Sequence, residues 1–270
     1  MQYTVDRDDA GVIQNTECFL LDMDGTIYLG GEWIEGAREF LTRVTESGRR
    51  WLFMTNNSSR SVDAYVKKLS DMGLSVTPDD ILSSSKAALD VLKREYAGAS
   101  VCLLGNSVLA AEFAAAGIDL RFSEDADICL AAYDTELTYQ KLCVFCNAVR
   151  KGKPYLATHP DFNCPVKGGF EPDLGSFMAL IEVSTGRKAD RIIGKPYRDF
   201  ADYAVACAGV PRERITVVGD RLYTDVKTGT ANGLGSVLVL SGEATLDDLA
   251  ASDVHPGAVF TSLKEMTPYL

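Results

Sequence analysis

The sequence predicts an α/β protein, in which a core domain with a mostly parallel β-sheet is interrupted by an inserted second α/β domain. Short apolar runs alternate with amphipathic helical stretches, as they do in parallel sheets covered by helices. Charged or hydroxyl residues follow the apolar runs in the outer parts of the chain, and the polar loops of the middle part do not repeat this strand-end carboxylate pattern. With 270 residues, 46% of them hydrophobic, the chain can bury a sizeable core.

The outer parts of the chain supply the core domain. Its strands are expected at residues 18–23, 51–54, 192–193, 215–218 and 237–240, and its first helices at 37–47 and from about residue 60 to Gly73. Parallel strands bring their carboxyl ends to one edge of a sheet, where ligands bind in open α/β folds. The polar residues after these strands are therefore expected to form a site.

The middle part runs a second series of elements. Helices are expected at 86–96 and 108–116, strands at 101–104 and 128–132, and a further helix-like stretch at 138–150. That stretch contains Cys143 and Cys146 in a CxxC pattern, but no second cysteine pair accompanies them. Packing of this helix is the stronger interpretation, and a zinc or redox role is the alternative.

Charge and composition limit the partners of the chain. The formal net charge is −11, which opposes binding to nucleic-acid backbones and anionic membranes. The acidic N-terminus lacks the pattern of a signal peptide, and no apolar run approaches membrane-spanning length. Together with the scattered cysteines, these features favour a cytoplasmic protein.

The chemistry is concentrated in a few residues after the core strands. Asp22 and Asp24 follow the first strand, Thr55 the second, Lys195 the third, and Asp220 and Asp225 the fourth. Neighbouring carboxylates repel each other unless a cation, a hydrogen-bond network or a reaction uses them. Carboxylate oxygens suit Mg²⁺, which would also let a phosphate approach them.

Four ordered motifs carry a family resemblance. DMDGT (22–26), MTNNSSRS (54–61), IIGKPY (192–197) and VVGDRLYTD (217–225) resemble the motifs of the haloacid dehalogenase superfamily, and more narrowly its NagD-like subfamily with p-nitrophenyl phosphatases. The resemblance covers essentially the whole chain. It implies a Rossmann-like catalytic core at 1–82 and 188–270, and an α/β cap at 83–187 that determines substrate specificity.

The resemblance also implies roles for individual residues. Asp22 would attack phosphorus and become an aspartyl phosphate, and Asp24 would act as general acid and then general base. Mg²⁺ would be held by Asp22, the backbone carbonyl of Asp24 and Asp220, with Asp225 ordering metal waters or Lys195; a helix-cap role is the alternative for Asp225. The phosphoryl group would be bound by Thr55, Asn56 and Lys195, with Asn57 as a further candidate for which a cap or turn role is the stronger interpretation.

Cap residues are expected to contact the part of the substrate that carries the phosphate. His159 and Asp161 are candidate specificity residues, with a surface-loop histidine as the alternative for His159. Asp173 is expected to cap the helix that follows it. The segment at 28–33 is expected to form a small flap beside the cap.

The leading hypothesis is a Mg²⁺-dependent phosphatase that acts on a small phosphate monoester, of the sugar phosphate, nucleotide or p-nitrophenyl phosphate type. Asp24 argues against dehalogenation, because a general acid serves an oxygen leaving group. Phosphoryl transfer to another hydroxyl and a non-catalytic phosphate-binding protein are alternatives, and the lack of GxGxxG after the first strand argues against a dehydrogenase. A homodimer formed through the cap is a further candidate assembly.

Overall fold

The computed structural model describes residues 3–166 and 168–270, and the chain divides into two compact units. The first unit contains the chain up to Thr55, Val66–Leu82 and Lys195–Leu270. The second contains Asn56–Tyr65 and Ser83–Gly194. No described helix is long and apolar enough to cross a membrane.

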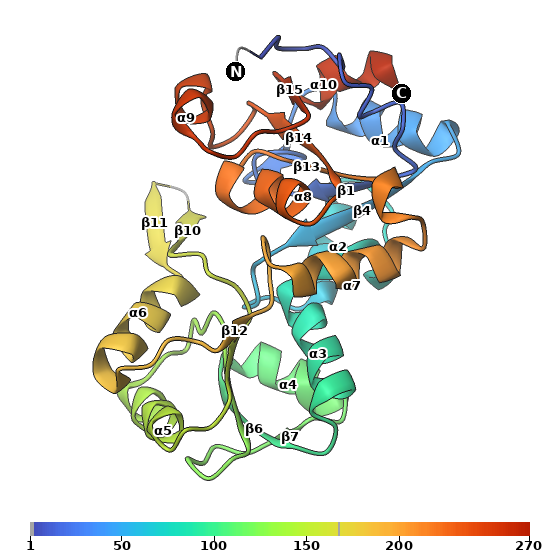
Figure 1. Cartoon of the computed structure of the whole chain (residues 1–270). Helices are drawn as coiled ribbons and strands as arrows, with labels where there is room; N and C mark the ends of the chain where they lie inside the picture. The colour runs from blue at the N-terminus through green and yellow to red at the C-terminus, as the bar shows by residue number, and fades with distance from the viewer. Residues whose placement is uncertain (1–2, 167) are drawn as a thin grey trace. The chain divides into compact units, whose positions relative to one another are not determined.

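The first unit is built on a six-stranded sheet in the order β15-β14-β13-β1-β4-β5 (Figure 1). The strands from β15 to β4 pair in parallel, and β1 is buried along its whole length. Leu21 is in register with Val218, and Asp22 with Met54, so the chain leaves the three central strands at one edge. The strands are β1 (Cys18–Asp22), β4 (Arg50–Thr55), β5 (Ile81–Ser83), β13 (Ile215–Gly219), β14 (Gly235–Val239) and β15 (Ala258–Phe260).

Helices of the first unit pack beside this sheet, with α1 next to α10 and α7 next to α8 (Figure 1). The helix α1 ends where the sequence places its stop, because Gly48 adopts a φ of 76° that other residues rarely take. The helices are α1 (Ala37–Glu46), α2 (Val62–Asp71, shared with the second unit), α7 (Arg198–Ala208), α8 (Lys227–Ala231), α9 (Leu246–Ala251) and α10 (Leu263–Met266), with short turns η1 (Pro78–Asp80), η2 (Arg212–Arg214), η3 (Leu222–Val226) and η4 (Thr267–Tyr269).

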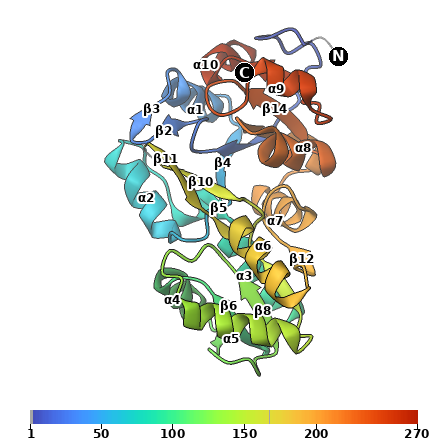
Figure 2. The same cartoon turned by 90° about the vertical axis from the view of Figure 1, so that its left-hand side faces the viewer.

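The second unit has its own five-stranded parallel sheet, in the order β12-β9-β8-β6-β7. The helix α5 packs on β6 and β8 and lies beside α6 (Figure 2). Cys146 of α5 is buried in this core, which agrees with a packing role for the helix that carries the CxxC pattern. The elements are β6 (Ser100–Leu104), β7 (Asp119–Leu120), β8 (Ile128–Ala131), β9 (Tyr155–Ala157), β12 (Arg191–Ile192), the hairpin β10 (Asn163–Val166) and β11 (Gly169–Pro172), α3 (Ser84–Glu95), α4 (Ser107–Ala115), α5 (Tyr139–Arg150) and α6 (Leu174–Thr185).

One predicted strand belongs to the other sheet. The strand at 192–193 is expected in the core domain, but β12 is an edge strand of the second unit and pairs in parallel with β9. A two-residue strand pairs with whichever sheet edge lies next to it in the folded chain. Its apolar pattern does not show which edge that is. The chain therefore passes into the first unit at Lys195. The assignment of the two units as catalytic core and specificity cap stays a prediction.

The segment after the first strand forms a small antiparallel hairpin. Its strands are β2 (Tyr28–Leu29) and β3 (Glu32–Trp33), with Tyr28 opposite Trp33. The expected small structure at 28–33 is thus a two-stranded hairpin within the first unit.

Candidate active site

Three buried carboxylates converge where β1 and β13 end. Asp22 is the last residue of β1, Asp220 follows β13, and Asp225 lies in the π-helical turn η3. Their exposed fractions are 9%, 2% and 0%. One carboxylate oxygen of each lies within 4.8 Å of the others. Such an arrangement concentrates negative charge in a poorly solvated place, and only cations or protons can offset it.

Lys195 supplies one of these cations. Its Nζ lies 2.6 Å from Asp22 Oδ1 and 2.6 Å from Asp225 Oδ1, and the residue is 3% exposed. Burial lowers the pKa of Lys195, but the two carboxylates outweigh burial, and the net result is a raised pKa. A solvated lysine, the ordinary alternative for this residue type, is therefore wrong here. The ammonium group is a fixed positive charge between two acids.

The single lysine does not neutralise all three acids. Burial raises the pKa of Asp22 well above its usual range, and the neighbouring Asp225 and Asp220 raise it further against the effect of Lys195. Burial and Asp225 likewise raise the pKa of Asp220 to about 6. The site is thus short of positive charge, which is what a divalent cation would supply.

Asp220 has the features of a metal ligand. Its Oδ2 accepts a hydrogen bond of 2.7 Å from the backbone N–H of Glu243, whereas its buried Oδ1 has no hydrogen-bond partner in the described part of the chain. Two glycines make room for this carboxylate. A Cβ at Gly25 would lie 2.3 Å from Asp220 Oδ2, and one at Gly242 would lie 2.0 Å away. The residues present therefore fit a hard cation such as Mg²⁺.

Asp225 is engaged differently. Its Oδ1 accepts from Lys195, and its Oδ2 accepts from the backbone N–H of Arg221 at 3.2 Å. Both oxygens thus have protein donors, so Asp225 is better placed to orient Lys195 than to bind a cation itself. Among the predicted metal ligands, Asp22 and Asp220 are the ones whose carboxylates lie in the cluster.

The Asp24 side chain is separate from the cluster. It is 61% exposed, and its Oδ1 lies 3.9 Å from Nζ of Lys68. The chain turns between the two acids, since Gly25 has a φ of 90° and donates its N–H to the Tyr28 carbonyl at 2.8 Å. An exposed acid is free to exchange protons with solvent, unlike Asp22.

The predicted phosphate-binding residues after β4 fall on both sides of the unit boundary. Thr55 is the last residue of β4, next to β1 in the sheet. Asn56 lies in the second unit, where its Nδ2 donates to both oxygens of Asp161 at 3.2 Å. Asn57 Oδ1 accepts from the N–H of Ser59 at 2.9 Å, which is a turn-forming bond. Phosphate binding by Thr55, Asn56 and Asn57 stays a prediction.

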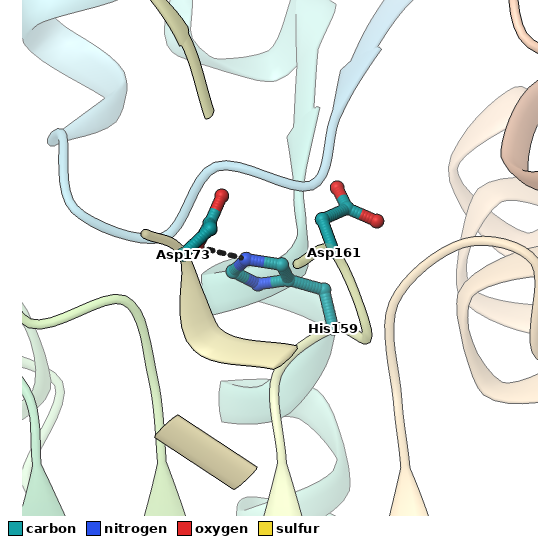
Figure 3. A group of neighbouring side chains, drawn as sticks. All are labelled: His159, Asp161 and Asp173. Carbon is teal, nitrogen blue, oxygen red and sulfur yellow. Dashed lines mark hydrogen bonds and ion pairs between the residues drawn. The ribbon is translucent and has the colours of Figure 1, made fainter. Parts of the chain in front are cut away.

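His159 is a core residue of the second unit, so the surface-loop alternative is wrong. It is 0% exposed, and its Nε2 lies 2.9 Å from Asp173 Oδ1 (Figure 3). Its Nδ1 lies 3.0 Å from Thr158 Oγ1. Asp173 also accepts from the Leu174 N–H at 2.6 Å, which confirms it as the cap of α6. Figure 3 shows Asp161 on the other side of the imidazole ring, and that carboxylate is partly buried.

Sequence reasoning missed two cations of the first unit. Arg221 is 18% exposed and forms a 2.9 Å ion pair with Glu243. Burial lowers the pKa of Arg221, but the surrounding acids, Asp22 and Asp225 first among them, raise it overall. Arg221 stands inside the quoted GDRLYTD motif, so it could have been found there. Lys68, beside Asp24, lies on a helix whose pattern gives no signal for it.

A parallel α/β sheet that ends in buried carboxylates and a buried lysine defines a protein that handles an anionic substrate together with a cation. Family models agree with this class. A haloacid dehalogenase-like hydrolase model matches residues 19–119, and a HAD-hydrolase-like model matches residues 192–266.

Known proteins similar to the chain cover nearly all of it. The acid sugar phosphatase of Staphylococcus aureus (strain MRSA252) is 32% identical over 249 residues, which are 92% of this chain and 96% of that protein. The solved structure of a 4-nitrophenylphosphatase from Thermotoga maritima is 43% identical, with a TM-score of 0.91 and coverage of 95% and 98%. That of a glycerol phosphate phosphatase from Mycobacterium tuberculosis, in complex with calcium, is 31% identical, with a TM-score of 0.86 and coverage of 94% and 76%.

The chain therefore belongs to the haloacid dehalogenase-like hydrolases, in their NagD-like subfamily. It is a phosphatase of that family. The resemblance expected from its four motifs is confirmed, as is the α/β fold class.

Proposed function

We propose that the chain is a Mg²⁺-dependent phosphatase that hydrolyses small phosphate monoesters through an aspartyl-phosphate intermediate. The observation that carries the proposal is the cluster of Asp22, Asp220 and Asp225 around Lys195, in which Asp220 keeps one buried oxygen without a hydrogen bond among the described residues. Asp22 and Asp220, together with the Asp24 carbonyl, would hold the ion. When bound, Mg²⁺ would offset the repulsion between the carboxylates and a phosphate dianion.

Asp22 is the nucleophile in this proposal. One of its oxygens forms a bond to phosphorus while the bond between phosphorus and the ester oxygen breaks. Asp24 gives a proton to the departing oxygen, so the alcohol leaves neutral. Asp24 then removes a proton from the water that attacks the aspartyl phosphate, which releases inorganic phosphate and restores the Asp22 carboxylate.

The burial of the two acids supports this division of work. Asp22 is held in one place by Lys195, as a nucleophile must be, because attack needs a fixed distance and direction. Asp24 is 61% exposed and can exchange its proton with solvent between the two half-reactions. Lys195, with Thr55, Asn56 and Asn57, is proposed to bind the phosphoryl oxygens, whose charge must be matched by positioned donors.

Names of similar proteins support the substrate class. They include an acid sugar phosphatase, a 4-nitrophenylphosphatase and a glycerol phosphate phosphatase. The esters in these names, sugar phosphate, 4-nitrophenyl phosphate and glycerol phosphate, are all phosphate monoesters of a small alcohol or phenol. We propose the same class for this chain, with Asp161 and His159 as candidate specificity residues.

The test is phosphate release from p-nitrophenyl phosphate, sugar phosphates, nucleoside monophosphates and glycerol phosphate, with Mg²⁺ or with EDTA. Native protein should be active only with Mg²⁺, and Asp22→Asn should be inactive and form no phosphoenzyme. Asp8→Asn is a matched control, because Asp8 is also 9% exposed but its carboxylate accepts the backbone N–H groups of Val12 and Ile13 in a turn. Equal rates for Asp22→Asn and the native protein would refute the assignment of the nucleophile.

A further inference from the structure

Lys68 is held beside Asp24 by an aromatic ring. Its Nζ lies 3.5 Å from the centroid of the Tyr28 ring and 3.9 Å from Asp24 Oδ1. The lysine side chain is 25% exposed, which is low for a residue type that normally extends into water. A cation over an aromatic face is stabilised most where water is partly excluded, so this ammonium group has a preferred position.

Tyr28 shares a rigid frame with the loop that carries Asp24. The tyrosine is 0% exposed. Its carbonyl accepts the Gly25 N–H at 2.8 Å, and its own N–H donates to the Met23 carbonyl at 3.1 Å. The ring therefore cannot shift without disturbing the residues on both sides of Asp24.

The part of α2 that carries Lys68 is anchored to the same hairpin. Trp33 of β3 donates its indole N–H to the Met72 carbonyl at 3.0 Å, just after α2 ends. Arg38 donates to the Gly73 carbonyl at 3.2 Å and lies over the Trp33 ring at 5.4 Å. Lys68 is thus fixed from two directions, by its helix and by the Tyr28 ring.

We propose that Lys68 is a positioning residue for Asp24. Proton transfer needs the Asp24 rotamer that reaches the ester oxygen, and a fixed cation beside the carboxylate limits which rotamers it adopts. An ordinary exposed ion pair contributes little to such a choice, because its lysine is as mobile as its acid. Here the lysine is fixed first, so its charge selects the Asp24 rotamers that lie on its side.

The consequence depends on the leaving group, and it rests on the proposed function. A p-nitrophenolate ion departs readily without a proton, whereas an alkoxide such as that of glycerol needs one. Loss of Lys68 should therefore slow formation of the aspartyl phosphate, which kcat/KM reports, much more with glycerol phosphate than with p-nitrophenyl phosphate. A structural defect would lower both rates by the same factor.

The experiment measures kcat and KM for both esters with Mg²⁺. For Lys68→Met, we expect the ratio of kcat/KM on glycerol phosphate to kcat/KM on p-nitrophenyl phosphate to fall roughly tenfold, a modest part of what general acid catalysis contributes. Lys68→Arg should keep the native ratio, because a guanidinium also stacks on an aromatic ring. Lys67→Met is the matched control, since Lys67 neighbours Lys68 but is 75% exposed and paired with Asp71.

Other outcomes overturn the inference. An unchanged ratio in Lys68→Met, or the same loss in Lys67→Met, would show that Lys68 does not position Asp24. A raised KM with unchanged kcat would make Lys68 a substrate contact instead. If Lys68→Met does not fold, a lowered ratio in Lys68→Arg would contradict the proposal on its own. Native protein that is inactive on every ester would instead refute the proposed function.

Discussion

Removal of the buried lysine should destabilise the first unit strongly and in a pH-dependent way. Lys195 is 3% exposed and lies 2.6 Å from both Asp22 and Asp225, so Lys195→Met leaves two buried carboxylates without their cation. Breaking a buried ion pair by removing one partner costs about 3–5 kcal/mol. Buried carboxylates without a cation take up protons as the pH falls. Each carboxylate that does so regains about 1.4 kcal/mol of stability for every pH unit below its raised pKa. The loss should therefore be about 3–5 kcal/mol at pH 8 and clearly smaller at pH 5.

Tryptophan fluorescence can follow this unfolding selectively, because Trp33 and Trp51 both lie in the first unit. The assay is urea unfolding in EDTA at the two pH values. Adding Asp225→Asn to Lys195→Met should restore part of the lost stability at pH 8, since it removes one of the unpaired charges. Lys67→Met should change stability by less than about 0.5 kcal/mol, as exposed pairs do. A loss for Lys195→Met that is the same at both pH values would refute the electrostatic reasoning.

Two further predictions follow from buried titratable groups. Because burial raises the pKa of Asp220 to about 6, the folded state without metal binds more protons at this residue than the unfolded state does between about pH 4 and pH 6, and the raised pKa of Asp22 acts in the same direction. The free energy of unfolding in EDTA should thus fall by roughly 3 kcal/mol as the pH rises through this window. Thermal melts should show a smaller fall with saturating Mg²⁺ or in Asp220→Asn. A free energy of unfolding that rises with pH would contradict the raised pKa of Asp220. In the second unit, His159→Phe should cost about 1–3 kcal/mol by removing the imidazole from the buried Asp173 carboxylate, which would keep the Leu174 N–H as a donor. The exposed His255→Phe should cost little, and equal melting temperatures of the two variants in circular dichroism would contradict the prediction.

Most of the fold could be predicted because hydrophobic periodicity is a local property. The strand predicted at 18–23 and the helix at 37–47 agree with β1 and α1 to within a residue at their ends. The position of β12 could not be predicted in the same way, because strand pairing depends on chain geometry and not on the apolar pattern of two residues. A short strand between two sheets is the kind of element for which local reasoning fails.

The candidate site shows the same division. Motif spacing brought Asp22, Lys195 and Asp220 to one place, as the structure has them. The burial of His159 could not be foreseen, because its partner Asp173 lies in a different loop and forms the bond only in the folded chain. Lys68 was missed for a related reason, since its role depends on a contact with Tyr28 across the first unit.

The two acids of the DMDGT motif differ because of where the strand stops. Residues two apart on a strand point to the same side, so strand geometry alone would give Asp22 and Asp24 similar surroundings. The strand β1 ends at Asp22, however, and the chain turns at Gly25, so Asp22 is 9% exposed while the Asp24 side chain is 61% exposed. Burial fixes Asp22 against Lys195, whereas the exposed Asp24 carboxylate has the Lys68 ammonium group beside it. A reaction that needs both a fixed nucleophile and a correctly aimed proton donor can therefore hold its two acids by different means: Asp22 by burial against Lys195, and Asp24 by the cation that the Tyr28 ring keeps beside it.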